Sequence, residues 1–308
     1  MNFPPTAPMT DTPCTRRRLL ALGALAPTAW LAACGTPLPR PGGPPGGATA
    51  DGQALLRESA DAHGWAAYRT LTDINIAYGG EWRPFIDRIQ PVVVDKAFRG
   101  ASEERLLPRE GVVAQAYTGP AGRKHVWWRR GSAAQAGEVG VWVNGTPSAD
   151  AALLDASALV AEAYGLFLLG PLWALDRGAP VLRDGSERFD GRLHDRLQLW
   201  VAPGLGRVAQ DRVTLLVDRS TRITRRLRFT LEGFAGTQGA VAEVDTYDHE
   251  RRFGVLWPMR SYEEVVHPLR LPAHDWFVRG LDVNRGHGAD ALRGPVFTGA
   301  AAAPAKPV

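Results

Sequence analysis

The most constraining feature for the fold is a long apolar segment in the middle of the chain, between two sets of short strands. Residues 148–169 (SADAALLDASALVAEAYGLFLL) carry apolar side chains at helical spacing behind a possible cap at Ser148. Gly170 and Pro171 interrupt the apolar run before Leu172 continues it. The pattern predicts two helices joined at a bend, and these helices are expected to cover a sheet.

Period-two alternation on both sides of this segment predicts antiparallel strands. Before it, strands are expected at 68–78, 92–98, 111–117, 124–130 and 139–143, after a short amphipathic helix at 53–65. After it, the apolar faces are Leu197, Leu199, Val201; Val213, Leu215, Val217; and Leu227, Phe229, Leu231. Arg226, Arg228 and Thr230 alternate with the last set, so the sheet is expected to be apolar on one side. The predicted fold class is α+β, a strongly curved antiparallel sheet covered by helices in a single domain at 53–290.

Two interpretations of the central helices remain open. In the first, the helices are permanent packing, with Phe167, Leu169 and Trp173 as core. In the second, helices and sheet enclose an apolar cavity able to take an acyl chain, in which Tyr164 and Trp173 offer a polar edge. The candidate ligand-binding residues of the second interpretation are Tyr164, Phe167, Leu169, Trp173, Leu199, Leu215 and Phe229.

The N-terminal region, residues 15–35 (TRRRLLALGALAPTAWLAACG), has the form of an export signal. It ends in Leu31-Ala32-Ala33-Cys34, the form of a bacterial lipobox. We expect residues 1–33 to be a signal peptide that is cleaved between Ala33 and Cys34, with diacylglycerol and palmitate carried by Cys34. A transmembrane anchor is the alternative, but the run is short for a membrane span and contains Pro27.

The same region carries a second targeting motif. Arg16 and Arg17 resemble the twin-arginine export signal, with an ordinary Sec signal as the alternative. Residues 34–52 are rich in Pro and Gly and predict a tether behind the lipid anchor, and 291–308 predict a disordered tail. Gly35 follows the lipidated cysteine, which favours the outer membrane, facing the periplasm.

Composition excludes several classes of function. The formal charge of +4 falls to +2 once residues 1–33 are set aside, with 33 basic against 31 acidic residues. Such a balance argues against a nucleic-acid partner. Cys14 lies in the part expected to be removed and Cys34 is expected to carry lipid, so no disulfide and no cysteine metal site is predicted.

Part of the C-terminal half resembles a known family. Residues 211–233 (DRVTLLVDRSTRITRRLRFTLEG) and 253–260 (FGVLWPMR) contain a strand ending in Asp218, a turn with Thr221, an Arg-rich return strand, and a step from Gly254 to Pro258. This pattern resembles the Lol-type superfamily of lipoprotein carriers, outer-membrane lipoprotein receptors and related envelope lipoproteins. The resemblance implies a half-open antiparallel barrel, lined with apolar side chains and closed by helices, that binds acyl chains.

One set of polar residues is a candidate for catalysis. Asp245, Tyr247 and His249 alternate on a predicted strand, so a carboxylate and an imidazole could share a proton or a metal. Neither an HExxH helix nor a GxSxG motif is present. We therefore expect no catalytic residue, no metal and no cofactor.

Three hypotheses for function follow. The first is a membrane-anchored envelope lipoprotein that binds a lipid or another hydrophobic ligand in a cavity. The second is a structural or scaffolding lipoprotein with a filled core and an envelope protein partner. The third is a hydrolase or metalloenzyme.

Overall fold

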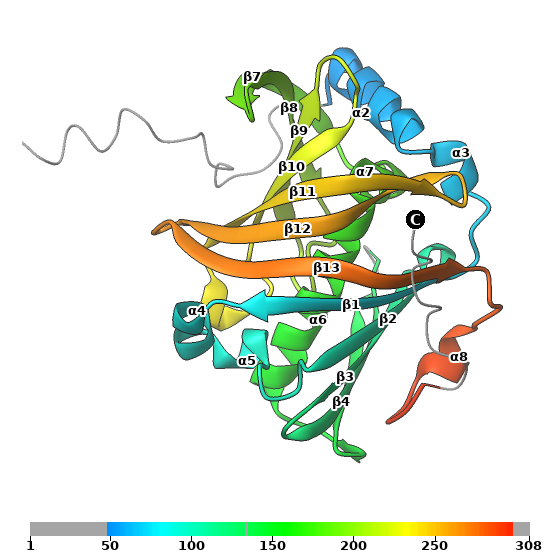
Figure 1. Ribbon diagram of the computed structural model, residues 1–308, viewed down its shortest axis with the longest axis vertical. Helices are drawn as coiled ribbons and strands as arrows, with labels where there is room; N and C mark the ends of the chain where they lie inside the picture. Colours follow the sequence, from blue (N-terminus) through cyan, green and yellow to red (C-terminus); the bar gives the residue numbers. More distant parts are fainter. Residues whose placement is uncertain (1–47, 133–134, 298–308) are drawn as a thin grey trace, which may run out of the picture. The chain divides into compact units, whose positions relative to one another are not determined.

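The computed structural model describes residues 48–132 and 135–297, which lie within one compact unit. Thirteen antiparallel strands form a sheet in which the first and the last strand are neighbours (Figure 1). β1 (Ile74–Trp82) pairs with β13 (Leu271–Val283), so this pair joins two meanders, β1–β6 and β7–β13. The sheet order ends at β6 on one side and β7 on the other, so the curved sheet is not closed.

Each meander follows the chain order. The first continues with β2 (Ala101–Leu107), β3 (Val112–Gly119), β4 (Gly122–Arg129), β5 (Glu138–Val143) and β6 (Thr146–Pro147). The second contains β7 (Val181–Phe189), β8 (Arg192–Val201), β9 (Asp211–Asp218), β10 (Thr224–Thr230), β11 (Val241–Arg252) and β12 (Val255–His267). Consecutive antiparallel strands with short connections produce this order directly.

The cover of the sheet consists of α6 (Ala151–Leu169) and α7 (Pro171–Asp176), which connect the two meanders. α6 begins at an Asp150 cap, whose Oδ1 accepts hydrogen bonds from the amides of residues 152 and 153 at 2.9 and 3.3 Å. Gly170, at φ +49°, separates the two helices. The predicted pair of helices with a bend is therefore confirmed, with the cap two residues after Ser148.

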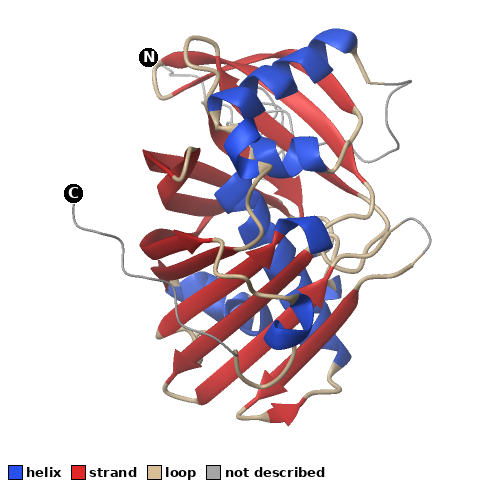
Figure 2. Ribbon diagram, turned by 90° about the vertical axis from the view of Figure 1, so that its right-hand side faces the viewer, coloured by secondary structure: helices blue, strands red, loops and turns tan. Residues whose placement is uncertain are grey.

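Shorter helices complete the described chain. α2 (Ala50–Ala62) and α3 (Trp65–Tyr68) lie near its start, and α2 packs against α7 and β7 (Figure 2). α4 (Pro84–Ile89) and α5 (Pro91–Val94) follow β1, and α8 (Ala289–Leu292) follows β13. Two 3-10 turns occupy Pro108–Glu110 and Ala235–Thr237.

One predicted strand begins later than expected, and another is wrong. Residues 65–68 form the α3 turn, so the strand expected from Tyr68 begins only at Ile74. The expected strand at 92–98 is the α5 turn followed by a loop. Pro84 and Pro91 each occupy the first turn of a short helix. The fixed φ of proline suits that position and outweighs the β propensity of the Val92–Val94 run.

Two strands were missed because their sequences are polar. β2 contains Glu103, Glu104 and Arg105 in succession, although Glu104 and Arg105 are buried on opposite faces of the sheet. β7 is an edge strand that is largely exposed and has a register irregularity between Arg183 and Ser186. Neither strand shows the alternation on which the prediction relied.

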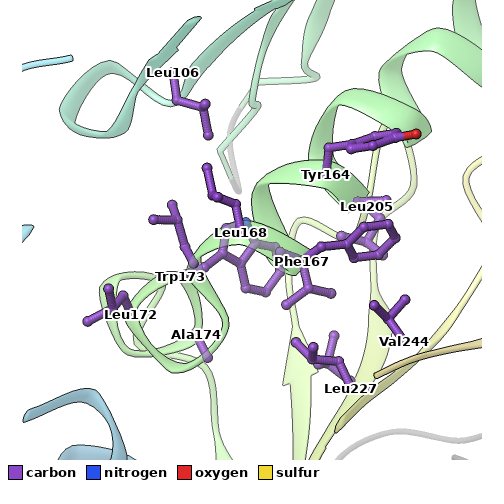
Figure 3. Close-up of a cluster of buried hydrophobic side chains, with 14 of the residues drawn as sticks. Leu106, Tyr164, Phe167, Leu168, Leu172, Trp173, Ala174, Leu205, Leu227 and Val244 are labelled. Atoms are coloured by element: carbon purple, nitrogen blue, oxygen red, sulfur yellow. The ribbon is translucent and has the colours of Figure 1, made fainter. Parts of the chain in front are cut away.

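The main hydrophobic core lies on the concave face of the sheet, against α6 and α7. Figure 3 shows part of it, where Phe167, Leu168 and Trp173 gather above Leu227 and Val244. A smaller cluster on the other face of β2–β4 includes Leu107, Trp127 and Leu292. The predicted fold class, a strongly curved antiparallel sheet covered by helices, is confirmed, and its open edges give the half-open barrel that the family resemblance implies.

The convex face of the second meander carries charges that are buried in ion pairs. Arg228 is fully buried, pairs with Glu243, and donates to Glu187 at 2.6 and 2.8 Å. Arg226 contacts Asp245 at 2.5 Å. The sheet is thus apolar on its concave side, as predicted, while its polar side is an ordered network.

Among the described helices, α6 is long and apolar enough to cross a membrane, judged by length and composition alone. In the structure 78% of its most apolar stretch is buried inside the domain. Its composition is accounted for by its position as the core helix.

Candidate ligand-binding cavity

A cavity of about 430 Å³ lies between the middle of α6 and one end of the sheet. Its walls come from α4 and α5, from the β10–β11 connection, and from the β12–β13 hairpin. The lining is mainly apolar and consists of Trp82, Phe85, Ile86, Ile89, Gln90, Val93, Leu159, Val160, Ala163, Tyr164, Phe167, Phe229, Leu231, Gly236, Thr237, Gln238, Ala240, Glu263, Val265, Pro268, Leu269, Leu271 and Ala273. Its volume lies within the range of about 300–1,000 Å³ that is typical of small-molecule sites.

The structure separates the seven candidate ligand-binding residues into two groups. Tyr164, Phe167 and Phe229 line the cavity, and the rings of Phe167 and Phe229 lie 5.4 Å apart. Leu169 and Trp173 border a separate hollow of about 30 Å³, and Leu199 and Leu215 are fully buried in the core. The helices therefore line a cavity towards one end of the half-barrel, its open end, and supply permanent packing towards the other, its packed end.

The packed end is held by a buried ion pair as well as by apolar contacts. Glu162 on α6 pairs with Arg177, which follows α7, and both side chains are almost fully buried. The Arg177 guanidinium lies 3.8 Å from the centre of the Trp173 ring. These contacts fix the bend at Gly170 against the sheet.

The mouth of the cavity is bordered by apolar side chains that remain in solvent. Phe85 and Ile89 on α4 are 54% and 46% exposed, and Leu269 in the β12–β13 connection is 66% exposed. All three also line the cavity. Because the interior is apolar and its rim is too, one hydrophobic surface leads from solvent to Phe167 and Phe229.

One side of the cavity is bordered by polar aromatic contacts. Arg99 donates from Nη1 to Tyr164 Oη at 3.0 Å, and His274 Nδ1 lies 3.5 Å from the same oxygen. The His274 ring stacks on Trp82 with centroids 4.2 Å apart. Burial, helped by the charge of Arg99, holds the pKa of His274 well below its ordinary value, so this imidazole is neutral.

Glu263 is the only carboxyl or basic side chain among the described residues that line the cavity. It is half-buried and projects from β12 opposite His274 of β13, and no described residue donates a hydrogen bond to it or forms an ion pair with it. Burial raises the pKa of Glu263 to about 7, while the nearby charge of Arg99 lowers it by less. The carboxyl therefore changes its protonation near neutral pH.

The carboxyl of Glu104 on β2 differs because it is fully buried and has hydrogen-bond partners. Gln115 Nε2 donates to it at 2.6 Å and the Tyr78 hydroxyl lies 3.5 Å away. Burial raises its pKa to about 7, although the hydrogen bond from Gln115 acts in the opposite direction. Neither Glu104 nor Glu263 was predicted from the sequence as a site residue. The alternation of β12, where Trp257 and Met259 face the core, would have placed Glu263 on the same inner face.

The residues considered for catalysis have separate partners. Asp245 accepts two hydrogen bonds from Arg226 and one from Tyr247, at 2.5, 2.7 and 3.3 Å. His249 Nδ1 lies 3.1 Å from Arg225 Nη1, and burial beside Arg225 lowers its pKa to about 4. The structure thus brings Asp245 and Tyr247 together but gives His249 another environment. Within residues 48–132 and 135–297, no group of three or more His, Cys, Asp or Glu side chains is placed to hold a metal ion.

The export and anchoring residues, Arg16, Arg17, Ala33 and Cys34, lie outside the described residues. The same holds for most of the expected tether at 34–52 and for residues 298–308 of the expected tail.

Comparison with known proteins gives similar structures but no sequence match. No protein-family model and no curated protein matches the chain. A DUF1329 family protein from Desulfovibrio piger is similar over 79% of this chain and 96% of its own, with 13% identity and a TM-score of 0.48. A LolA superfamily protein from Nitrosomonas europaea is similar over 76% of this chain and 93% of its own, with 10% identity and a TM-score of 0.40. The superfamily that the sequence resembles is thus also named among the similar structures.

Proposed function

We propose that this protein is a membrane-anchored envelope lipoprotein that binds a lipid or acyl chain in the cavity beside α6. The observation that carries the proposal is the cavity of about 430 Å³ with an apolar lining and an apolar rim. Each buried methylene group contributes about 0.8 kcal/mol to transfer from water. An acyl chain against Phe167 and Phe229 would therefore bind through burial alone, without catalytic groups.

An apolar cavity wall in contact with water is also unfavourable for the protein itself. The side chains that line it keep apolar surface in solvent and lack packing partners on that side. A hydrophobic ligand supplies these contacts for Leu159, Phe167 and Phe229. Such a ligand would stabilise the folded state by an amount that grows with the logarithm of its concentration relative to its Kd.

The direct test is native mass spectrometry of the full chain, comparing a cavity-blocking variant with a matched control. Ala163 lines the cavity, so Ala163→Trp should remove bound lipid. Ala152 is exposed on the same helix, so Ala152→Trp should keep it. Lipid adducts in the wild type and in Ala152→Trp, and their loss in Ala163→Trp, are the expected result. A wild-type protein that carries no lipid and takes up none when supplied would refute binding and favour a scaffolding role.

The anchor is proposed from the sequence pattern at the N-terminus. Acylation at Cys34 would hold the domain at one membrane through the segment at 34–52, and Gly35 favours the outer membrane facing the periplasm. A tethered domain of this kind suits local capture of a ligand more than free diffusion between membranes. The two acyl chains of diacylglycerol and the palmitate at Cys34 together exceed the two anchoring signals that stable membrane attachment requires.

Metabolic labelling with palmitate tests the anchor. The wild type should incorporate label, and Cys34→Ser should remain an unlabelled, unprocessed precursor, because the thiol that accepts the lipid is absent. Label retained by Cys34→Ser would show that the cleavage site is misassigned.

Replacing Arg16 and Arg17 together by lysine should block export by the twin-arginine route, and continued export would indicate the Sec route.

A further inference from the structure

A single carboxyl interrupts the apolar wall of the cavity. Along β12 the inward-facing positions before it carry Trp257, Met259 and Ser261, which are buried, and Val265 follows it in the cavity wall. A leucine at position 263 would continue the apolar wall. Glu263 is half-buried, and partial removal of a carboxyl from water without a hydrogen-bond partner is unfavourable, so the wall is less stable with Glu263 than it would be with an apolar side chain.

The polar groups near Glu263 are engaged with one another. The Tyr164 hydroxyl accepts from Arg99 at 3.0 Å and lies 3.5 Å from His274 Nδ1, and the His274 ring is stacked on Trp82. Arg99 also donates from Nη2 to the Val93 carbonyl at 3.2 Å. Glu263 has no such contact among the described residues, and it lines the cavity. Its hydrogen-bonding capacity is therefore directed to whatever occupies the cavity.

We propose that Glu263 binds the polar end of the ligand, and that the ligand is a single-chain lipid whose polar end is an uncharged hydroxyl group. This inference rests on the proposed binding of a lipid in the cavity and specifies which class of lipid it takes. The hydrocarbon chain would lie against Phe167 and Phe229, and the hydroxyl would meet the carboxyl at the strand position beside Tyr164.

The charges around the cavity disfavour the other common polar ends. A fatty-acid carboxylate would place a second anion next to Glu263, where the two like charges repel. An ammonium group would pair with the ionised carboxylate, but it would also be repelled by Arg99, the cation that already acts on Glu263. A hydroxyl donates to the ionised carboxylate and accepts from the protonated carboxyl, so it satisfies Glu263 in either state.

The test compares three probes with the same chain, dodecanol, dodecanoate and dodecylamine, each displacing a fluorescent lipid from the full-length protein above the pKa of Glu263. Dodecanol should bind about tenfold more tightly than dodecanoate, the equivalent of one charge-assisted hydrogen bond. Dodecylamine should also bind more weakly than dodecanol, because of Arg99.

Three variants separate the role of the carboxyl from general effects. Glu263→Leu should remove the preference for dodecanol while still binding the chain. Glu263→Gln should keep dodecanol binding, because an amide oxygen still accepts, and should strengthen dodecanoate binding because the negative charge is gone. Glu264→Gln is the control, since Glu264 pairs with Arg270 and is absent from the cavity lining, and it should behave as the wild type.

The outcomes distinguish this inference from the proposal on which it rests. Equal binding of dodecanol and dodecanoate by the wild type, or an unchanged preference in Glu263→Leu, would overturn the role of Glu263 while leaving the cavity as a lipid site. Failure of all three probes to bind both the wild type and a folded Glu263→Leu variant would overturn lipid binding itself, and this inference with it. Thermal unfolding of each variant establishes that it is folded.

Discussion

The open end and the packed end of the half-barrel interior are similar in composition and different in structure. At the packed end, Leu169 and Trp173 meet a sheet whose Leu199 and Leu215 are fully buried. At the open end, Tyr164 and Phe167 face a cavity of about 430 Å³ whose rim is exposed. The apolar character of a segment shows that it is buried, but it does not show whether a side chain or a ligand fills the space beside it.

The difference arises from the elements that close each end. The packed end is covered by α7 and α2, and the ion pair between Glu162 and Arg177 is buried there. The open end is closed only by α4, α5 and two strand connections. Short helices supply little apolar surface, so they border the space without filling it.

The largest expected effect compares leucine truncations at the two ends. Leu215→Ala should lower the free energy of unfolding by about 2–5 kcal/mol, because it leaves a void in a packed region. Leu269→Ala, at the exposed rim, should change it by less than about 0.5 kcal/mol. Urea denaturation measures both. Similar losses for the two variants would mean that the rim is as tightly packed as the core.

A second comparison concerns the pH dependence of stability and Glu104, the buried carboxyl that has hydrogen-bond partners. The folded-state pKa of Glu104 is raised from 4.5 to about 7, so its contribution to stability is present below pH 4.5 and is lost as the pH rises towards 7. The loss should be about 3 kcal/mol, since each pKa unit corresponds to about 1.4 kcal/mol. Glu104→Gln should therefore be more stable than the wild type above neutral pH and equal to it in acid.

Denaturation curves on both sides of this pH range measure the effect. The readout is the difference in stability between the two proteins at each pH, because Glu263, Asp211 and His249, whose pKa values are also shifted, titrate in both proteins. A difference that does not grow between acid and neutral pH would contradict the raised pKa of Glu104.

Enlarging an alanine should also destabilise the packed end more than the open end, because only the open end has space for a larger side chain. Ala174→Phe adds a ring where no space exists, and should reduce the free energy of unfolding by about 1–3 kcal/mol. Ala163→Phe directs the same ring at the cavity, and should change it by less than about 0.5 kcal/mol while weakening lipid binding. Equal destabilisation of the two variants would argue against a cavity beside Ala163.

The smallest expected effect concerns the polar border of the cavity. Tyr164→Phe removes the hydrogen bond from Arg99 and should lower the free energy of unfolding by about 1 kcal/mol. Ser157→Ala on the same helix is the control, because the Ser157 hydroxyl is buried and no described residue bonds it. Its removal should be neutral or stabilising. A larger loss in Ser157→Ala than in Tyr164→Phe would show that the Arg99 contact contributes little.

Parts of the binding site could be predicted because they follow from periodicity. The helical spacing of Tyr164 and Phe167, and the alternation that turns Phe229 inward, place all three in the cavity wall. Leu199 and Leu215 follow the same pattern and are core. Local spacing orients a side chain towards the inside but does not state its distance from the opposite wall.

The sequence alone determined that the chain forms two sets of antiparallel strands around a pair of covering helices, because hydrophobic periodicity and the glycine and proline positions are local properties. Only the tertiary structure decided that β1 pairs with β13, that the α5 turn and a loop replace the strand expected at 92–98, and that Glu263 faces an apolar cavity. These depend on contacts between residues far apart in the chain. The packed end and the open end of the half-barrel differ for the same reason, since the elements that close them come from distant parts of the sequence.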